Sequence, residues 1–190
     1  GLTEVSISEG VKTIGDSAFY SCVGLTNVTI PNSVTAIGYA AFAECAGLTF
    51  VSIPNNVTSI GERAFSGCSG LTKVNYLGTV DKWVELDFRS SYDNPTYYGK
   101  NLYIDGDLLT DVKITEADSI KDNAFYNCQN IKSVEIGNSV TSIGSSAFSG
   151  CTGLTSVVWR AKNYKDFKSS SDAPFYNISS QIASFNFGKE

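Results

Sequence analysis

The sequence predicts an α/β repeat protein, a right-handed solenoid with short parallel strands on one side and short helical or 3-10 pieces on the other. A unit of constant length recurs along the chain. Each unit opens with the alternation of apolar and polar residues that is typical of a strand with one buried face. Because one unit cannot bury its own apolar face, successive units must stack and share a core. We expect roughly seven such strands along one side.

The repeat is visible when the chain is aligned with itself. Three copies of twenty-three positions each follow one another without gaps from Leu2, Leu25 and Leu48, and a fourth clean copy starts at Ile131. A fifth copy, from Leu109, is one residue shorter. The clean copies read LTEVSISEGVKTIGDSAFYSCVG, LTNVTIPNSVTAIGYAAFAECAG, LTFVSIPNNVTSIGERAFSGCSG and IKSVEIGNSVTSIGSSAFSGCTG.

The start of the second copy shows how a strand is specified. Val28 and Ile30 alternate with Asn27 and Thr29, so the two apolar residues share one face. Pro31 follows directly and should end the strand, because proline has no N–H to donate to the ladder.

The rest of the copy predicts the return path. Ile37 faces the core again, and Gly38 permits a tight change of direction. In the segment from Tyr39 to Cys45, Ala41 and Cys45 lie four residues apart and share a helical face. We therefore expect one helical turn here, packed on the strand layer.

The string LTxVxIPxxVTxIGxxAFxxC resembles the leucine-rich repeat of the BspA type, named after a bacterial surface antigen. The resemblance covers Leu2 to Leu77 and Leu109 to Trp159, and it implies a leucine-rich-repeat solenoid. Proteins of this family generally carry an asparagine after the strand that forms a ladder between coils. We expect no continuous asparagine ladder here, because the matching positions hold Gly10, Ser33, Asn56 and Ser139.

Two longer units interrupt the regular repeats. We expect aromatic residues in 78–108 and 160–190 to replace the Ala-Phe-Cys filling, and the second unit to close the open end of the solenoid. A single solenoid then spans residues 1–190, with regular repeats at 1–77 and 109–159. The aromatic residues of the two long units include Trp83, Tyr92, Tyr97, Tyr98 and Tyr103, then Tyr164, Phe167, Phe175 and Tyr176, followed by strand-like residues 182–187.

Composition argues against several classes of function. The net charge is −5, from 14 Lys and Arg against 19 Asp and Glu, and no cationic cluster suits a nucleic-acid backbone. No stretch approaches the ~20 apolar residues of a membrane helix, and the start does not resemble a secretion signal. Because the chain opens with Gly1 and contains no methionine, we interpret it as a fragment or a processed chain. An uncapped first coil at Leu2 would expose core, so we expect native sequence before it.

Five cysteines share one repeat offset, which predicts an internal column of free thiols that pack as small apolar groups. An odd number leaves at least one unpaired. An occasional disulfide or a metal site is the alternative, and the absence of a C-x-x-C pair weakens zinc. The cysteines are Cys22, Cys45, Cys68, Cys128 and Cys151.

Nothing in the sequence indicates an enzyme. The chain contains no histidine, which removes the usual general acid–base group and the Ser-His and Cys-His pairs. Acid pairs such as Asp105 with Asp107 would have to converge in a pocket to hydrolyse a glycoside, and solvated turns are the simpler interpretation. The Asp105-Gly106-Asp107 turn also falls far short of a calcium loop. We expect no catalytic residue, cofactor or metal.

The outward residues of the strands are the first candidates for ligand binding, because the strand side is the usual binding surface of a solenoid. Most are small and polar, which suits a solvated face without a ligand equally well. Phe50 is the one large apolar residue among them, and an exposed aromatic is a common interface anchor. The expected outward positions are Glu4, Ser6, Asn27, Thr29, Phe50, Ser52, Lys73, Asn75, Asp111, Lys113, Ser133, Glu135, Ser156 and Val158.

The aromatic residues of unit 78–108 are the second candidates, with core filling as the alternative. From the two sets we select the ligand-binding candidates Phe50, Lys73, Asn75, Lys113, Glu135, Tyr97 and Tyr98.

The resemblance implies a non-enzymatic module for adhesion or protein binding, extracellular or on the cell surface. Proteins like this are generally found on bacterial surfaces, and the implied partner is a host matrix protein, a glycan or a cell-surface protein. The alternative is a passive spacer within a larger surface protein. An adhesin should present a contiguous apolar or charged patch on the strand face or on unit 78–108, whereas a spacer should show neither. We expect no nucleic-acid partner and no membrane insertion by this chain.

Overall fold

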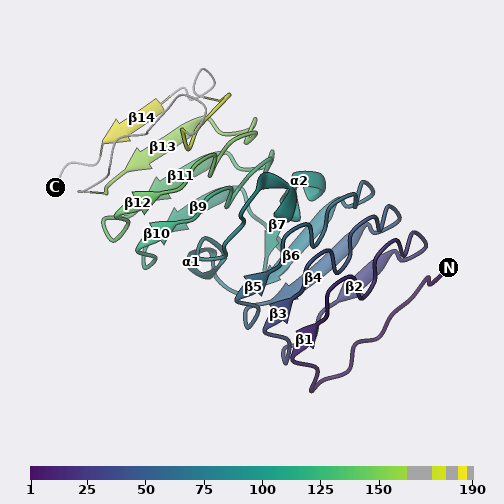
Figure 1. Cartoon of the computed structure of the whole chain (residues 1–190). Helices are drawn as coiled ribbons and strands as arrows, with labels where there is room; N and C mark the ends of the chain where they lie inside the picture. The colour runs from purple at the N-terminus through teal and green to yellow at the C-terminus, as the bar shows by residue number, and fades with distance from the viewer. Residues whose placement is uncertain (162–172, 179–183, 188–190) are drawn as a thin grey trace.

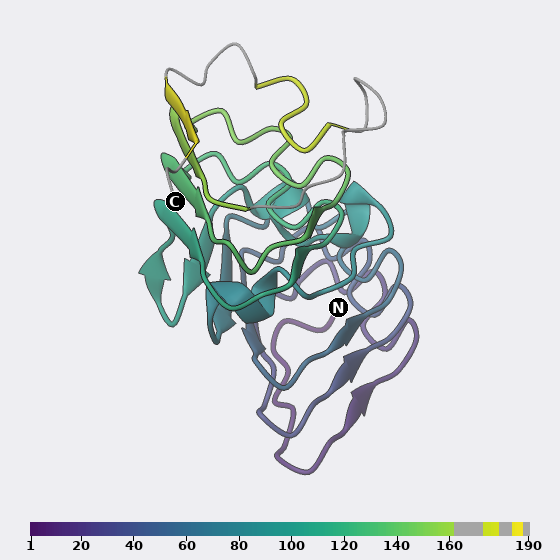
Figure 2. The same ribbon diagram turned by 90° about the vertical axis from the view of Figure 1, so that its left-hand side faces the viewer.

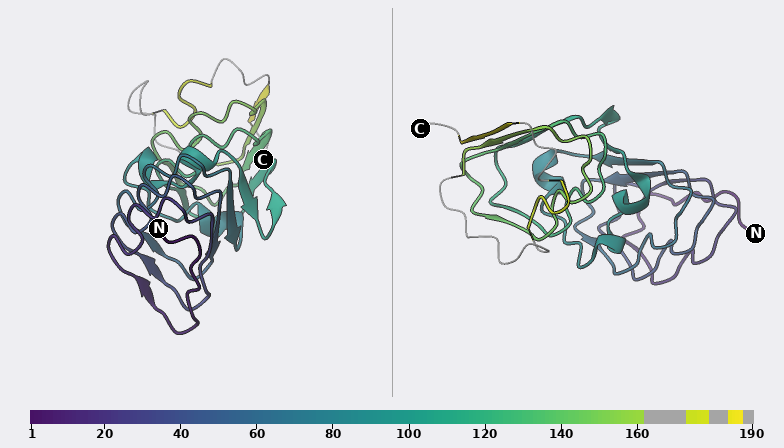
Figure 3. Two further views of the ribbon diagram at one scale, coloured as in Figure 1. Left: turned by 90° about the vertical axis from the view of Figure 1, so that its right-hand side faces the viewer. Right: turned by 90° about the horizontal axis from the view of Figure 1, so that it is seen from above.

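The computed structural model describes residues 1–161, 173–178 and 184–187. The chain winds into an elongated solenoid with two stacks of regular coils, and α1 and α2 lie between them (Figure 1). We call residues 13–77 the N-terminal stack, residues 109–161 the C-terminal stack and residues 78–108 the expanded coil. The view from above shows the stacks at opposite ends of the molecule (Figure 3). The predicted repeat solenoid is confirmed.

The long strands form two sheets. In the N-terminal sheet, of order β2-β4-β6-β7-β8, only β8 is antiparallel, whereas all strands of the C-terminal sheet, of order β14-β13-β11-β9, are parallel. Equivalent repeat positions pair, so that Val28 lies beside Val51 and Val51 beside Val74. The strands are β2 (Asn27–Thr29), β4 (Phe50–Pro54), β6 (Lys73–Leu77), β7 (Leu102–Ile104), β8 (Asp107–Leu108), β9 (Asp111–Ile114), β11 (Ser133–Ile136), β13 (Ser156–Trp159) and β14 (Ser184–Phe187).

A second row of two-residue strands, which the sequence pattern did not predict, has one member after each of β2, β4, β9 and β11 and one in the first copy. Parallel pairing joins the members of this row within each stack, and the isoleucines Ile14, Ile37 and Ile60 point from it into the core. The row is formed by β1 (Thr13–Ile14), β3 (Ala36–Ile37), β5 (Ser59–Ile60), β10 (Ser119–Ile120) and β12 (Ser142–Ile143).

The expected helical turn of the regular repeats is absent from the described coils, and this detail of the prediction is wrong. The segment that contains Phe42 is a series of turns, because Ala40 and Glu44 adopt positive φ angles of 50° and 60°. A left-handed residue every four positions interrupts α-helical hydrogen bonding. The backbone N–H groups that have no helical partner donate instead to carbonyl groups of the next coil. Phe42 N, for example, donates to Ala64 O at 2.8 Å.

Two columns of side chains fill the core behind the sheets. The rings of Phe19, Phe42 and Phe65 stack with centroids 5.1 and 5.4 Å apart, a spacing typical of favourable aromatic pairs. The second column consists of the cysteines, whose thiols are free, as predicted. The thiols of Cys45 and Cys68 each donate a hydrogen bond to the backbone carbonyl of the phenylalanine 26 residues earlier.

The first copy does not form its expected strand. Residues 1–8 have no strand, and the side chain of Leu2 is 43% exposed. This copy has a neighbouring coil on one side only among the described residues, so its apolar residues gain less burial from stacking than those of inner coils.

In the described part of the chain, helices occur only in the expanded coil. They are α1 (Val80–Trp83), the 3-10 helix η1 (Ser91–Asp93) and α2 (Thr96–Gly99). Trp83 is fully buried and packs in the core against Phe88, with ring centroids 5.6 Å apart. An aromatic residue thus fills the core here, as predicted for this unit.

The described part of the last unit continues the C-terminal stack. Phe175 extends the phenylalanine column at 5.1 Å from Phe148, and Phe148 N donates to Pro174 O as in a regular coil. Ile178 is buried three positions after Phe175, at the offset that a cysteine holds in regular repeats. The predicted aromatic residues Tyr164 and Phe167 and the start of the strand-like segment 182–187 lie outside the described residues.

Side chains of the expanded coil bond to the backbones of both stacks. On one side, the Asp93 carboxylate accepts from Arg63 N at 2.8 Å, and the Tyr98 hydroxyl accepts from Gly67 N at 3.0 Å. On the other, the buried Asn94 amide donates to Asn123 O at 2.7 Å. A buried backbone group needs a hydrogen-bond partner, and here side chains provide partners that the next coil's backbone provides elsewhere.

Candidate functional site

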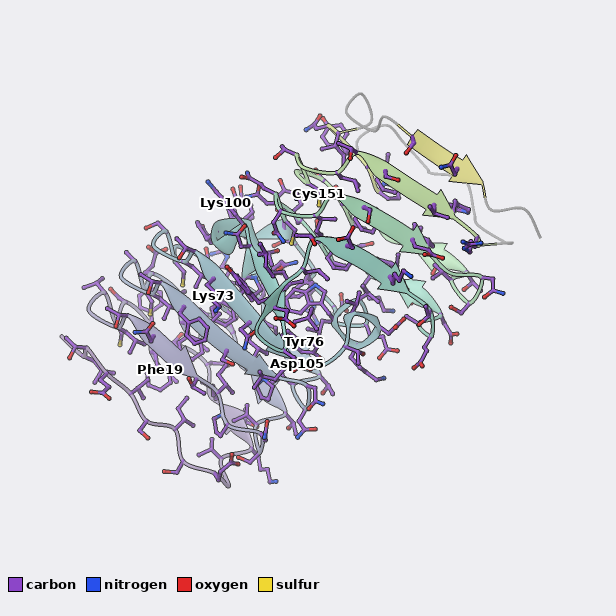
Figure 4. All side chains as sticks on the ribbon, turned by 180° about the vertical axis from the view of Figure 1, so that it is seen from behind. Phe19, Lys73, Tyr76, Lys100, Asp105 and Cys151 are labelled. Atoms are coloured by element: carbon purple, nitrogen blue, oxygen red, sulfur yellow. The ribbon has the colours of Figure 1, made fainter. Side chains whose placement is uncertain are left out.

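Two strand-face candidates meet in one cluster. Lys73 Nζ on β6 lies 5.6 Å from the ring centroid of Phe50 on β4 and 4.3 Å from that of Tyr103 on β7. A cation is attracted to the faces of aromatic rings at these distances. Together with Leu108 of β8, we call these residues the strand-face cluster; Figure 4 labels Lys73 within it.

A hairpin places Leu108 in this cluster. Asp105 and Gly106 connect β7 to β8 with φ angles of 49° and 93°, and two successive positive φ angles are typical of the type I′ turn that an Asp-Gly pair favours. Tyr103 and Leu108 are directly opposed, so their side chains lie on the same face. Leu108 is 43% exposed, and the hairpin projects from the side of the molecule (Figure 2).

Asn75 supports the hairpin instead of facing solvent. The strand pattern predicts an outward ligand-binding position here, but the Asn75 side chain is buried, as is that of Ser52 on the neighbouring strand. Asn75 Oδ1 accepts a hydrogen bond from Gly106 N at 2.9 Å, and its Nδ2 lies 3.4 Å from Ser52 Oγ. The expectation of an exposed Asn75 is wrong, because the hairpin covers it.

The candidates Lys113 and Glu135 lie together on the C-terminal sheet, where Lys113 and Arg160 both pair with Glu135. Glu135 accepts from Arg160 Nε at 2.8 Å and lies 3.7 Å from Lys113 Nζ. Lys73 differs, since it forms no ion pair with any carboxylate that the structure describes. The strand face therefore offers a cation without an ion pair in the N-terminal sheet and two cations paired with one carboxylate in the C-terminal one.

The candidates Tyr97 and Tyr98 lie away from the strand-face cluster, in a group of tyrosines around α2. The ring of Tyr97 has centroid distances of 4.6 Å to Tyr92, 4.8 Å to Tyr98 and 5.7 Å to Tyr126. A hydrogen bond with Tyr92, followed by partial burial, raises the pKa of the Tyr97 hydroxyl. Tyr103, which the sequence groups with these residues, belongs to the strand face.

Two hollows are lined in part by members of the tyrosine group. One lies beside Tyr97 and Tyr98 and includes Lys100, which ends α2 and is labelled in Figure 4. The other is lined by Glu62, Arg63, Ser66, Ser90 and Tyr92. The polar residues of the second hollow were not selected from the sequence, because they come from two coils whose contact a single sequence does not reveal.

The buried thiols are poor nucleophiles. Burial raises the pKa of Cys45 to about 11 and the pKa values of Cys68 and Cys128 to about 12, and the thiolate is the reactive form of cysteine. No group of three or more metal-ligating side chains occurs within residues 1–161, 173–178 and 184–187. Over the same residues, no helix has the length and apolar character to cross a membrane.

A family model describes this architecture. The model for the BspA type leucine rich repeat region matches in 6 copies, over residues 1–93 and 96–190. The chain therefore belongs to the BspA-type leucine-rich-repeat family. Leucine-rich-repeat proteins typically bind other proteins and generally serve as non-enzymatic scaffolds.

The chain is also similar to solved structures of leucine-rich-repeat proteins. The chain is similar to a leucine-rich repeat protein of T. pallidum, TpLRR, at 23% identity and a TM-score of 0.51, over 91% of this chain and 76% of that one. A leucine-rich repeat protein from Bacteroides ovatus is 25% identical, with a TM-score of 0.47 over 82% of this chain and 41% of its own. A leucine-rich cell surface protein from Faecalibacterium prausnitzii is 23% identical, with a TM-score of 0.44 over 86% of this chain and 55% of its own. This chain thus spans less than two thirds of the last two proteins, and no curated protein matches its sequence.

Proposed function

We propose that this chain is a non-enzymatic protein-binding module that acts in adhesion at the surface of a bacterial cell. The observation that carries the proposal is the strand-face cluster, which joins two aromatic rings, an unneutralised lysine and an exposed leucine on adjacent strands. Its location outside the cell follows from the family and is part of the proposal.

The composition of the cluster fits a protein partner. Aromatic residues are enriched among the side chains that contribute most to binding, and an exposed apolar residue beside them adds surface that a partner can bury. Lys73 retains N–H groups for an acceptor on the partner while both rings hold it in place. A passive spacer needs no such cluster, and this favours binding over the alternative function.

The test is a binding screen with matched variants. The purified chain is passed over immobilised fibronectin, fibrinogen and other host matrix proteins, together with Phe50→Ser, Leu108→Ser and the control Lys113→Gln. We expect saturable binding that falls by about tenfold or more in Phe50→Ser and Leu108→Ser, as for truncation of a central interface residue. Lys113→Gln should bind like the unchanged chain.

Equal binding by all variants would exclude the strand-face cluster as the interface. No binding to any matrix protein would contradict the adhesion role and favour the spacer.

A further inference from the structure

The hollow beside Tyr92 has an aromatic wall that is exposed and held in place. Tyr92 is 51% exposed. Its ring lies 4.6 Å from that of Tyr97. Tyr97 is stacked on Tyr126 and meets Tyr98 edge to face. The ring of Tyr92 is therefore oriented before any ligand arrives, which lowers the entropic cost of binding.

A buried carboxylate joins the two polar walls of this hollow. Asp93 is 1% exposed, and its Oδ1 accepts from Arg63 N at 2.8 Å while its Oδ2 accepts from Ser90 N at 2.9 Å. Arg63 and Ser90 both line the hollow but come from different coils. The Asp93 carboxylate thus fixes the distance between the wall that contains Arg63 and the wall that contains Ser90.

The side chains around the rim carry both donors and acceptors. Arg63 Nε lies 3.8 Å from Glu62 Oε1, and the two side chains are 62% and 51% exposed. An exposed pair at this distance interacts weakly, so both groups remain available to a ligand. Ser66 and Ser90 add hydroxyls that both donate and accept.

We propose that this hollow binds a neutral hexopyranose unit of a glycan. A pyranose ring has an apolar C–H face that packs on an exposed aromatic ring and a rim of hydroxyls. Adjacent sugar hydroxyls donate to the Glu62 carboxylate and accept from the Arg63 guanidinium. The acid and the base together add no net charge, and this favours a neutral sugar over a phosphate or an acidic sugar. The site lies between the N-terminal stack and the expanded coil, and it shares no residue with the strand-face cluster.

Saturation-transfer NMR tests the proposal directly. The whole chain is mixed separately with methyl β-D-galactopyranoside, methyl β-D-glucopyranoside and methyl α-D-mannopyranoside. We expect transfer to the ring C–H protons of at least one glycoside, with a dissociation constant on the order of 1 mM, because one sugar ring buries little surface.

Matched variants locate the sugar. Tyr92→Ala should weaken binding by about tenfold, since stacking on the ring is lost. Glu62→Gln should weaken it several-fold while leaving the fold unchanged. Tyr20→Ala is the control, because Tyr20 is a similarly exposed tyrosine, at 55%, on a coil far from the hollow in sequence.

Each other outcome overturns the proposal. The absence of transfer to all of the glycosides would show that the hollow is not a hexopyranose site. Transfer that persists in Tyr92→Ala, or disappears equally in Tyr20→Ala, would place the sugar elsewhere. The same variants separate this proposal from the proposed protein-binding function, which depends on the strand face. Tyr92→Ala should still bind matrix proteins, whereas Phe50→Ser should lose that binding.

Discussion

In the N-terminal stack, each turn segment bonds to the next through the backbone, whereas residues 90–99 of the expanded coil bond to the turn segments of both neighbours through side chains. Phe42 N donates to Ala64 O in the regular arrangement. At the junction, Asp93 and Tyr98 accept from backbone N–H groups, and Asn94 donates to a backbone carbonyl.

This difference determines how much each region depends on its own sequence. Backbone hydrogen bonds between regular coils form whichever residue occupies the position, provided that it tolerates the turn. The bonds that residues 90–99 form with both stacks exist only with particular side chains. We therefore expect single substitutions to be more harmful at the junction than at equivalent polar positions in the stacks.

The largest expected effect is that of Asn94→Ala. The substitution removes the donor to Asn123 O and the acceptor of Thr96 N, both of which are buried or nearly so. Two unsatisfied buried groups should lower the free energy of unfolding by about 2–4 kcal/mol. The control is Asn56→Ala, which removes one exposed bond to Asn32 O and should cost about 0.5 kcal/mol or less. Urea denaturation measures both.

The same experiment tests whether residues 1–190 form one folding unit, as we propose. Fluorescence from Trp83 at the junction and Trp159 in the C-terminal stack, with circular dichroism, should give one coincident transition in the unchanged chain. Asn94→Ala should separate the transitions of the two stacks. Two transitions in the unchanged chain would contradict the single unit.

A second comparison concerns two glycines at the same repeat offset. A Cβ on Gly61 would lie 2.5 Å from Gly38 C and 2.6 Å from Tyr39 N, whereas a Cβ on Gly15 would meet nothing within 4 Å. Gly61→Ala should therefore destabilise the chain by about 2 kcal/mol, and Gly15→Ala by no more than about 0.5 kcal/mol. Equal thermal midpoints for the two variants would show that the coils do not pack this closely.

Asp81 gives the junction a dependence on pH. Its Oδ1 accepts from the backbone N–H groups of Thr115, Glu116 and Ala117, at 3.0, 2.9 and 2.9 Å. Burial alone raises the pKa of this carboxyl, but the three backbone donors and the Thr115 hydroxyl together lower the pKa below its ordinary value.

Because the pKa of Asp81 is lower in the folded chain than in the unfolded one, the ionised carboxylate stabilises the folded chain. This contribution to the free energy of unfolding is complete at pH values above the unfolded-state pKa. The contribution is lost as the pH falls through the folded-state value. Asp81→Asn should cost about 1 kcal/mol at pH 7 and nearly nothing at pH 2, after allowance for solvent screening. Unfolding free energies at both pH values check this. An equal cost at both would show that the carboxylate charge does not stabilise the turn.

The smallest expected effect is that of Glu135→Gln on the C-terminal sheet. It removes the ion pairs with Lys113 and Arg160, which are exposed. Such pairs contribute little, so the unfolding free energy should change by less than about 0.5 kcal/mol. A chemical denaturation curve in low and high salt measures it, and a loss above about 1 kcal/mol would show that this face depends on side chains as the junction does.

The sequence predicted what depends on the repeat itself. Val28 and Ile30 identified the buried strand face, and the shared offset of the cysteines identified their column. Phe50 and Lys73 occupy the same offset in successive copies, so their pairing on adjacent strands also follows from the period. All of these are consequences of one local pattern repeated in register.

In the turn segments, the spacing of apolar residues led to the wrong prediction of a helical turn. Ala41 and Cys45 have helical spacing, but φ is positive at the positions of Ala40 and Glu44. A signal existed in other copies, since Gly67 and Gly150 occupy one of these positions and tolerate positive φ. The Asp105-Gly106 pair was likewise a hairpin signal, which the interpretation of this segment as a solvated turn left out.

Other features had no local signal. Asp93 and Asn94 act through backbone groups about 30 residues away in sequence. No spacing rule connects an irregular coil to its neighbours, so the hollow beside Tyr92 could not be built from the sequence. Asn75 was misplaced for the same reason, because its burial depends on a hairpin at the far end of the expanded coil.

The expanded coil also bears on how such a chain can change in evolution. A regular coil presents equivalent backbone groups to the coil before it and the coil after it, so duplication of residues 25–47 would lengthen a stack without altering its ends. The expanded coil presents different side chains to each neighbour, so we expect its duplication to leave some of these groups without their partners. We therefore expect stack length to vary more readily by recombination than the expanded coil, whose tyrosine group and hairpin should be inherited together.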